Sequence, residues 1–170
     1  MKIRIYLIVP LCLGVLGAAP AAMAETRAFF SPGSNIQATI VDQISRSSHS
    51  IDAMACGLSA KRIASALVYA KTRGLKVRVI ADKSQSRAKN SYIGFLISKG
   101  VPVRLLSGRK KGLMHNTLGI FDGNTLITGS FNWTNDSAFY NFENVIMTDD
   151  NALVQEYKEE FDKLWSDGRK

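Results

Sequence analysis

The stretch AKTRGLKVRVIAD, Ala70 to Asp82, decides the fold class, because it passes from a helix into a strand across one glycine. The helix has apolar residues at helical spacing, and Gly74 is the residue type that commonly ends a helix. KVRVIAD, at 76–82, then alternates polar and apolar side chains, as a β-strand does. A helix joined so closely to a strand indicates a sheet with helices packed on it.

The same alternation of strand and helix extends outward from this stretch. Toward the N-terminus we expect a strand at RAFF (27–30), a helix after the turn at 31–34, a strand at SIDAMAC (50–56) and a helix capped by Ser59. Toward the C-terminus we expect a helix at 84–100 and a strand at 101–106. Strands and helices in alternation are typical of a parallel sheet covered by helices.

The second half of the chain has an antiparallel pattern. TLGIF (117–121) and TLITG (125–129) flank DGN (122–124), which is a hairpin-type turn. NFENVIM (141–147) is one more predicted strand, and 151–168 has apolar residues on one helical face. The sequence therefore predicts a single α/β domain with a mixed β-sheet flanked by helices.

We interpret residues 1–24 as a secretory signal peptide. Their start is basic, with Lys2 and Arg4, residues 7–22 are almost wholly apolar, and the last three have the small-x-small pattern of a cleavage site. The apolar run is roughly 16 residues and contains two prolines, whereas a membrane-spanning helix needs about 20, so a stable membrane anchor is the less favoured alternative. We therefore expect residues 25–170 to form one secreted or periplasmic domain.

The composition favours an anionic partner but does not require one. The net charge of the chain is +8, and most of this excess lies beyond the signal peptide. A basic secreted domain fits nucleic acid or an anionic membrane surface, although charge alone fits a basic soluble protein equally well. Cys56 is the only cysteine beyond the signal peptide, so no internal disulfide is expected, and its apolar neighbours indicate a buried, inert thiol.

The chain has two histidines, which we interpret differently. His49 lies in the polar connection RSSHS and is expected to be a surface loop residue. His115 begins a predicted strand, on which His115 and Thr117 should point the same way. A single histidine at a strand start is usually structural, so its role depends on what lies near it.

Polar residues at two further strand ends should lie near His115. Ser130 and Asn132 follow the next strand, and Glu143 starts the strand after that. Imidazole can attack phosphorus or protonate a leaving oxygen, a carboxylate can orient it, and hydroxyl and amide donors can hold phosphoryl oxygens. No acidic cluster with metal-ligand spacing accompanies the histidine, so we expect no metal and no other cofactor. This set of residues favours a phosphodiester-cleaving site.

Three motifs stand out around these residues: HNTLGIFD (115–122), GSFNW (129–133) and NFEN (141–144). They resemble the pattern H-x-K-x4-D, G-S-x-N and E-N of the phospholipase D superfamily, and most closely its small secreted bacterial endonucleases. The likeness also includes AFFSPG near the start, the stretch from Ala70 to Asp82 and the LW of the last helix. The resemblance therefore covers nearly all of the chain beyond the signal peptide, and it implies a single phospholipase D-like domain.

The resemblance also implies a mechanism. In the family, one motif histidine attacks phosphorus and forms a phosphohistidine, while a second protonates the leaving group and then activates water, without a metal. Two motifs build one site, and this chain has one motif. It should therefore form a homodimer with a shared active site, in which the two copies of His115 meet across a two-fold axis.

The family roles carry over to single positions. His115 matches the motif histidine, Asp122 the motif aspartate, and Glu143 the carboxylate that orients histidine. Ser130 and Asn132 match the phosphate-binding pair. Asp122 fits an ordinary hairpin-turn residue equally well.

Thr117 departs from the family pattern, because it stands where the motif has lysine. Losing one well-placed donor to the phosphoryl group typically costs about 10²–10³ in rate. Either the protein is a weakened relative that still binds polyanions, or another cation substitutes. Arg109, Lys110 and Lys111 precede His115 and could bind phosphate beside Thr117, although such a run is commonly just a solvated face.

Three functions follow from these residues. The first is a metal-independent phosphodiesterase, foremost a non-specific endonuclease on DNA or RNA. The second is a phospholipase D activity on phospholipids, which the lack of any expected exposed aromatic cluster weakly disfavours. The third is a nucleic-acid-binding relative in which Thr117 has removed useful catalysis.

Overall fold

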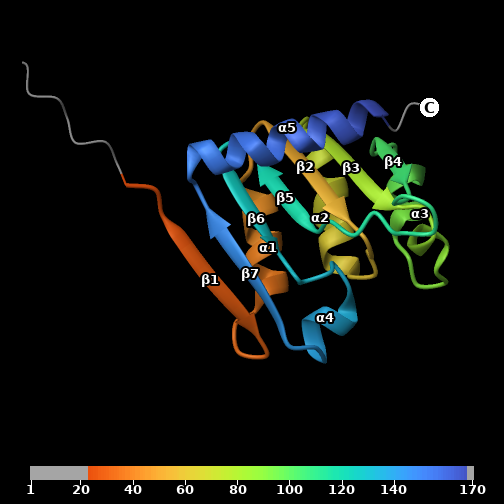
Figure 1. Cartoon of the computed structure of the whole chain (residues 1–170), viewed down its shortest axis with the longest axis horizontal. Coiled ribbons are helices and arrows are strands. Elements are labelled where there is room, and N and C mark those ends of the chain that lie inside the picture. The colour runs from red at the N-terminus through yellow and green to blue at the C-terminus, as the bar shows by residue number, and fades with distance from the viewer. Residues whose placement is uncertain (1–22, 168–170) are drawn as a thin grey trace, which may run out of the picture.

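The computed structural model describes residues 23–167, so nearly all of the predicted signal peptide lies outside the described residues. One seven-stranded sheet has the order β1-β7-β6-β5-β2-β3-β4 (Figure 1). Its strands are β1 Thr26–Ser31, β2 Ser50–Ala55, β3 Lys76–Asp82, β4 Val103–Leu106, β5 Leu118–Phe121, β6 Thr125–Gly129 and β7 Glu143–Thr148. The β2, β3 and β4 strands are parallel, and all other neighbours are antiparallel. The predicted α/β domain with a mixed sheet is confirmed.

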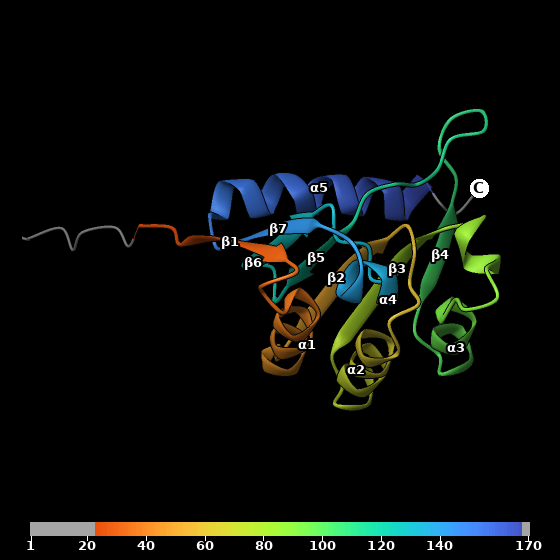
Figure 2. The ribbon, with the colours of Figure 1, turned by 90° about the horizontal axis from the view of Figure 1, so that it is seen from below.

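Helices cover both faces of the sheet. They are α1 Ile36–Arg46, α2 Lys61–Thr72, α3 Ile93–Ser98, α4 Asn135–Phe139 and α5 Asn151–Asp167. In Figure 2, α1, α2 and α3 lie on one face of the sheet and α5 lies across the other. Two apolar cores result, the larger beneath α1–α3 and the smaller beneath α5.

Local sequence explains where α1 begins and where α2 ends. The Asn35 side chain accepts a hydrogen bond from the Ala38 N–H (2.9 Å) and caps α1, whose Ile36, Ile40 and Ile44 are buried at helical spacing. Beyond α2, Gly74 adopts a φ of +94°, a left-handed conformation that favours glycine and turns the chain into β3.

The helix predicted at 84–100 is wrong over its first half. Only a 3₁₀ turn at Gln85–Arg87 and the short α3 form there. The Asp82 carboxylate accepts hydrogen bonds from the N–H groups of Ser84 (2.8 Å) and Gln85 (2.9 Å), which closes a tight turn instead of a helix.

The cap predicted for α2 is also wrong. Ala60 stands at the cap position, and no side chain caps the helix. The Ser59 hydroxyl instead accepts a hydrogen bond from the N–H of Asn135 (3.2 Å), which ties this loop to the start of α4.

Two smaller predictions are confirmed. Cys56 is buried, and its burial raises the pKa of the thiol, so the inert form is favoured. His49 is exposed in the loop before β2. Within residues 23–167, none of the helices has the length and apolar character needed to cross a bilayer.

Candidate active site

Strand pairing brings the ends of β5, β6 and β7 to one edge of the sheet. Leu118 at the start of β5 pairs with Thr128, and Gly129 at the end of β6 pairs with Val145 near the start of β7. The residues just before β5, just after β6 and at the start of β7 are therefore neighbours, beside α4 (Figure 1). The predicted convergence of these three strand ends is confirmed.

Glu143 is held by hydrogen bonds to both of its carboxylate oxygens. Ser130 Oγ donates to Oε2 (2.5 Å), and Asn141 Nδ2 donates to Oε1 (3.0 Å). The Ser130 hydroxyl also accepts from the N–H of Asn144 (3.1 Å). Among the hydrogen bonds of residues 23–167, none joins Glu143 to His115 within the chain.

The lack of a side chain at Gly129 allows the end of β6 to lie close to the start of β7. A Cβ added there would lie 2.7 Å from the Cα of Val145 and would also clash with the Asn144 carbonyl. The sequence motif G-S-x-N contained this glycine, but its role was not predicted, because it depends on how two strands approach each other.

Thr117 is nearly buried, at 9% exposed, whereas His115 is exposed. The strand begins only at Leu118, and the strict alternation of side chains does not extend back through the irregular residues before it. The Thr117 hydroxyl donates to Asn132 Oδ1 (3.2 Å). This bond holds the amide oxygen of Asn132 inward, so its NH₂ is the group left to donate to a ligand.

His115 is exposed and lies at the rim of a surface hollow of about 490 Å³. Leu113, Glu160 and Leu164 also line this hollow, so α5 forms one of its walls. The N–H of the preceding residue, Met114, donates to Asp82 Oδ2 (2.8 Å). The imidazole is therefore accessible, while the backbone before it is fixed.

The structure does not bring Asp122 to His115. Asp122 lies in the β5–β6 turn with a φ of +52°, at the opposite end of β5 from His115. Its carboxylate accepts from the backbone N–H groups of Ser48 (2.9 Å), His49 (2.7 Å) and Ser50 (2.9 Å). Burial would raise the pKa of Asp122, but these hydrogen bonds outweigh it and hold the pKa below its ordinary value. The hairpin-turn alternative fits these contacts.

The cations Arg109, Lys110 and Lys111 lie on an exposed loop between β4 and β5. A bridge between Ser107 and Leu113 closes the loop, which projects beyond β4 in Figure 2. Leu113 also borders the hollow beside His115, so the base of the loop reaches the site. Within residues 23–167, these three cations form no ion pair.

An exposed aromatic cluster lies next to Glu143, contrary to the sequence prediction. Phe139, Tyr140 and Phe142 are 67%, 80% and 88% exposed, and the rings of Phe139 and Tyr140 meet edge to face. Phe139 is the last residue of α4, and Tyr140 and Phe142 lie between it and the first residue of β7. We call these three residues the aromatic cluster.

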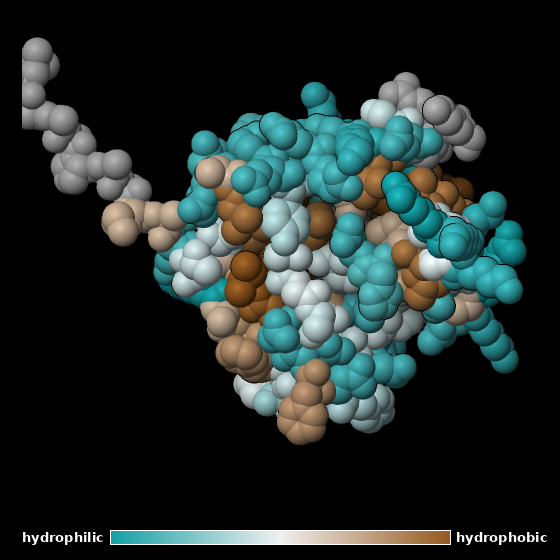
Figure 3. All heavy atoms as spheres, in the orientation of Figure 1, coloured by the Kyte–Doolittle hydropathy of each residue, from teal (hydrophilic) through white to brown (hydrophobic). Residues whose placement is uncertain are grey.

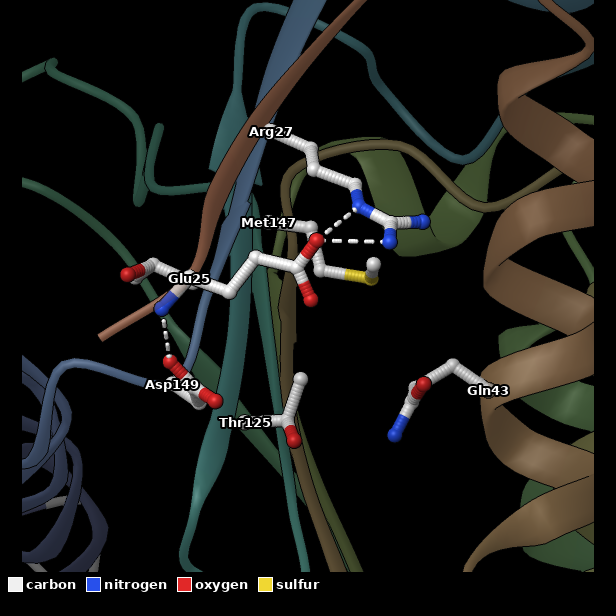
Figure 4. Close-up of a pocket in the computed structure, with 7 residues that line it drawn as sticks. Glu25, Arg27, Gln43, Thr125, Met147 and Asp149 are labelled. Carbon is white, nitrogen blue, oxygen red and sulfur yellow. Dashed lines mark hydrogen bonds and ion pairs between the residues drawn. The ribbon is translucent and has the colours of Figure 1, made fainter. Parts of the chain in front are cut away.

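A second hollow, of about 150 Å³, lies away from these residues, where β1 and β7 face α1 (Figure 4). Its main polar groups are satisfied within the chain, because Arg27 pairs with Glu25 (2.6 Å) and the Glu25 N–H donates to Asp149 (2.6 Å). Asp149 follows the far end of β7 from Glu143, so this hollow is not part of the site. Among residues 23–167, no three His, Cys, Asp or Glu side chains gather as metal ligands would.

Fold and candidate site together define a class of α/β protein in which hydroxyl, amide and carboxylate groups are hydrogen-bonded at the ends of neighbouring strands and a histidine precedes the strand beside them. A family model described as the PLD-like domain of cardiolipin synthase matches residues 40–165. The chain therefore belongs to the phospholipase D superfamily.

Individual relatives agree with this assignment. A mitochondrial cardiolipin hydrolase from Xenopus tropicalis is 37% identical over 122 residues, which cover 72% of this chain and 57% of the relative. A phospholipase D from Rickettsia felis is 36% identical over 128 residues, which cover 75% of this chain and 63% of the relative. The chain thus spans less than two thirds of these relatives. The crystal structure of a phospholipase D family member, Nuc from Salmonella typhimurium, has a TM-score of 0.78 at 26% identity and covers 85% of this chain and 95% of that one.

Proposed function

We propose that the protein is a phosphodiesterase, foremost a non-specific endonuclease on DNA or RNA, with His115 as the nucleophile. The supporting observation is the gathering of His115, Ser130, Asn132 and Glu143 at one sheet edge in a phospholipase D-like fold. The exposed imidazole attacks phosphorus, and a phosphohistidine forms as the leaving oxygen departs with a proton.

Hydrogen-bond donors beside His115 hold the phosphoryl oxygens in this proposal. The NH₂ of Asn132 is oriented by Thr117, and the Ser130 hydroxyl exchanges its acceptor, Glu143, for a phosphoryl oxygen when substrate binds. In this proposal one imidazole is the nucleophile and a second imidazole is the acid, so the reaction needs no metal ion. Asp122 has no part in it, because its carboxylate is engaged at the opposite sheet edge.

A second histidine must protonate the leaving group, and we propose that a second copy of the chain supplies it. The sheet beside α5 offers an uncovered apolar surface for such a partner. Phe30 on β1 and Ile146 on β7 are 61% and 36% exposed, and Figure 3 shows apolar surface over β7 below α5. In the proposed homodimer the two copies of His115 meet across a two-fold axis.

Phospholipid is the second candidate substrate, and the aromatic cluster favours it. Exposed Phe and Tyr side chains suit the boundary between a bilayer and water, and the net charge of +8 suits anionic lipid. The names of the curated relatives, cardiolipin hydrolase and phospholipase D, point the same way. We retain the predicted secreted or periplasmic location as part of the proposal.

One experiment tests both candidates. The chain from residue 25 is assayed in EDTA on plasmid DNA, on single-stranded RNA and on cardiolipin vesicles, beside His115→Ala. His49→Ala is the matched control, since His49 lies in the loop at the opposite sheet edge. We expect cleavage that disappears only in His115→Ala, and the substrate that is cleaved decides between nuclease and lipase. Activity that survives His115→Ala would contradict the proposal.

A further inference from the structure

Asp82 ends β3 and is only 1% exposed, yet it has no role in the proposed chemistry. A carboxylate buried to this degree is costly unless its oxygens are bound. Among residues 23–167 it forms no ion pair, so hydrogen bonds alone compensate its charge. The donors that compensate the charge of Asp82 are therefore the groups that this carboxylate holds in place.

The two oxygens of Asp82 bind different parts of the chain. Oδ1 accepts from the hydroxyl (2.5 Å) and N–H (2.8 Å) of Ser84 and from the N–H of Gln85 (2.9 Å). Oδ2 accepts from the N–H of Met114 (2.8 Å), 32 residues along the chain. Burial would raise the pKa of Asp82, but these donors outweigh it and lower the pKa, so the carboxylate stays ionised.

The bond to Met114 fixes the backbone immediately before His115. Regular pairing of β5 begins only at Leu118, so no strand ladder holds His115 itself. The Met114 side chain is buried in the core beneath α5, while His115 is exposed. The last anchored peptide before the imidazole is therefore the one that Asp82 binds.

We propose that Asp82 is a positioning residue, which sets the place of the His115 imidazole by holding the Met114 N–H. The inference rests on the proposed function for its effect on rate, but not for its effect on structure. A displacement of about 1 Å in a reacting group can cost about 10²-fold in rate.

Asp82→Asn tests the proposal, because an amide has one acceptor oxygen where the carboxylate has two. The single amide oxygen cannot accept hydrogen bonds both from Ser84 and Gln85 and from Met114. The NH₂ would then face a backbone N–H, to which it cannot donate. We expect kcat to fall about 10²-fold with little change in KM, since Ser130 and Asn132 stay in place. The control is Asp52→Asn, which disrupts another buried carboxylate, paired with Arg78 (2.7 Å), away from the site. It should lower Tm and leave kcat unchanged.

A second readout does not depend on catalysis. The chain has only two histidines, so the imidazole signals of His115 and His49 can be followed together by NMR. Asp82→Asn should move the His115 signal and leave that of His49, and Asp52→Asn should move neither. A folded Asp82→Asn protein with an unmoved His115 signal and unchanged kcat would overturn the inference. If no diester is cleaved at all, the proposed function fails, while the NMR result still decides the role of Asp82.

Hydrogen exchange on the unaltered protein covers the case in which Asp82→Asn does not fold. The Met114 N–H should exchange far more slowly than that of Asn116, which lies in the unpaired residues before β5. Equal exchange rates at the two amides would show that Asp82 does not hold Met114, and the inference would be wrong.

Discussion

Thr117 is the residue at which this chain departs from its family, and the structure explains what the threonine does instead. Its hydroxyl orients Asn132 from a position that is 9% exposed. The site therefore keeps one oriented amide donor but lacks the positive charge of the motif lysine.

Thr117→Lys should raise phosphodiesterase turnover by about 10²-fold, because the ammonium group would stabilise the charge on the phosphoryl oxygens. The four-carbon stem must extend from a nearly buried position, so Tm should fall. Turnover on one diester substrate and thermal unfolding measure the two effects. Thr117→Val, which removes only the hydroxyl, is the control and should not gain activity. If the unaltered protein and both variants are folded and equally inactive, the protein is a nucleic-acid-binding relative and not a phosphodiesterase.

Asp122 should make the stability of the protein depend on pH in acid. Its pKa is lowered in the folded state, so its contribution is complete above the ordinary value of about 3.9 and is lost as pH falls through the folded pKa. Asp122→Asn should cost about 1–3 kcal/mol at pH 7 and reduce the further loss of stability below about pH 4. Urea unfolding at both pH values measures this. Asp42→Asn, which breaks an exposed pair with Arg46, should change little at either pH.

At the residue scale, the sequence predicted which side chains gather but not how they are held. Strand order and strand ends were enough to bring His115, Ser130 and Glu143 to one edge. The inward direction of Thr117 and the bond from Asp82 to Met114 depend on irregular backbone, which no periodic pattern describes.

At the element scale, the β4–β5 loop concentrates charge at the border of the site. Arg109, Lys110 and Lys111 follow one another on an exposed loop whose base lines the hollow beside His115. If they bind phosphates, they contribute affinity that is independent of sequence and sensitive to salt.

Changing all three loop cations to Gln should flatten the plot of log affinity for DNA against log salt. On duplex DNA the slope should fall by about 0.9 for each phosphate that the variant no longer neutralises. The control changes Lys71, Lys76 and Lys99 to Gln. These lysines lie near the start of β3 and the ends of α2 and α3, at the opposite end of the parallel strands from the loop. The control alters net charge equally and should leave the slope nearly unchanged. The opposite ranking of the two variants would place the polyanion surface elsewhere.

The strands were predicted more accurately than the helices, for a physical reason. Strand periodicity in KVRVIAD comes from the residues that β3 itself buries, so the pattern and the element coincide. The segment 84–100 has helix-forming residues, but Asp82 takes the N–H groups with which a helix would begin. Ser59 likewise serves α4 rather than α2, which only tertiary structure reveals.

At the scale of the whole molecule, a single copy presents one His115 and an uncovered apolar surface beside α5. We expect the chain from residue 25 to be a two-fold dimer at micromolar concentration, as light scattering would measure. Because each shared site needs two histidines, refolding the protein with an excess of His115→Ala chains should reduce activity more than dilution alone. A monomer that cleaves the diester, or a loss no greater than dilution, would contradict the shared site.

The place of β1 in the sheet has a consequence for the order in which the molecule is made. β1 is an edge strand that pairs only with β7, and the hydrogen bond between Thr26 and Thr148 joins residues 122 positions apart. A ribosome delivers β1 first and β7 last among the seven strands of the sheet. Until then Phe29 and Phe30 have no strand beside them, and Glu143, which arrives on β7, is missing from the site. The sheet therefore stays incomplete, and the candidate site lacks Glu143, until β7 has emerged from the ribosome.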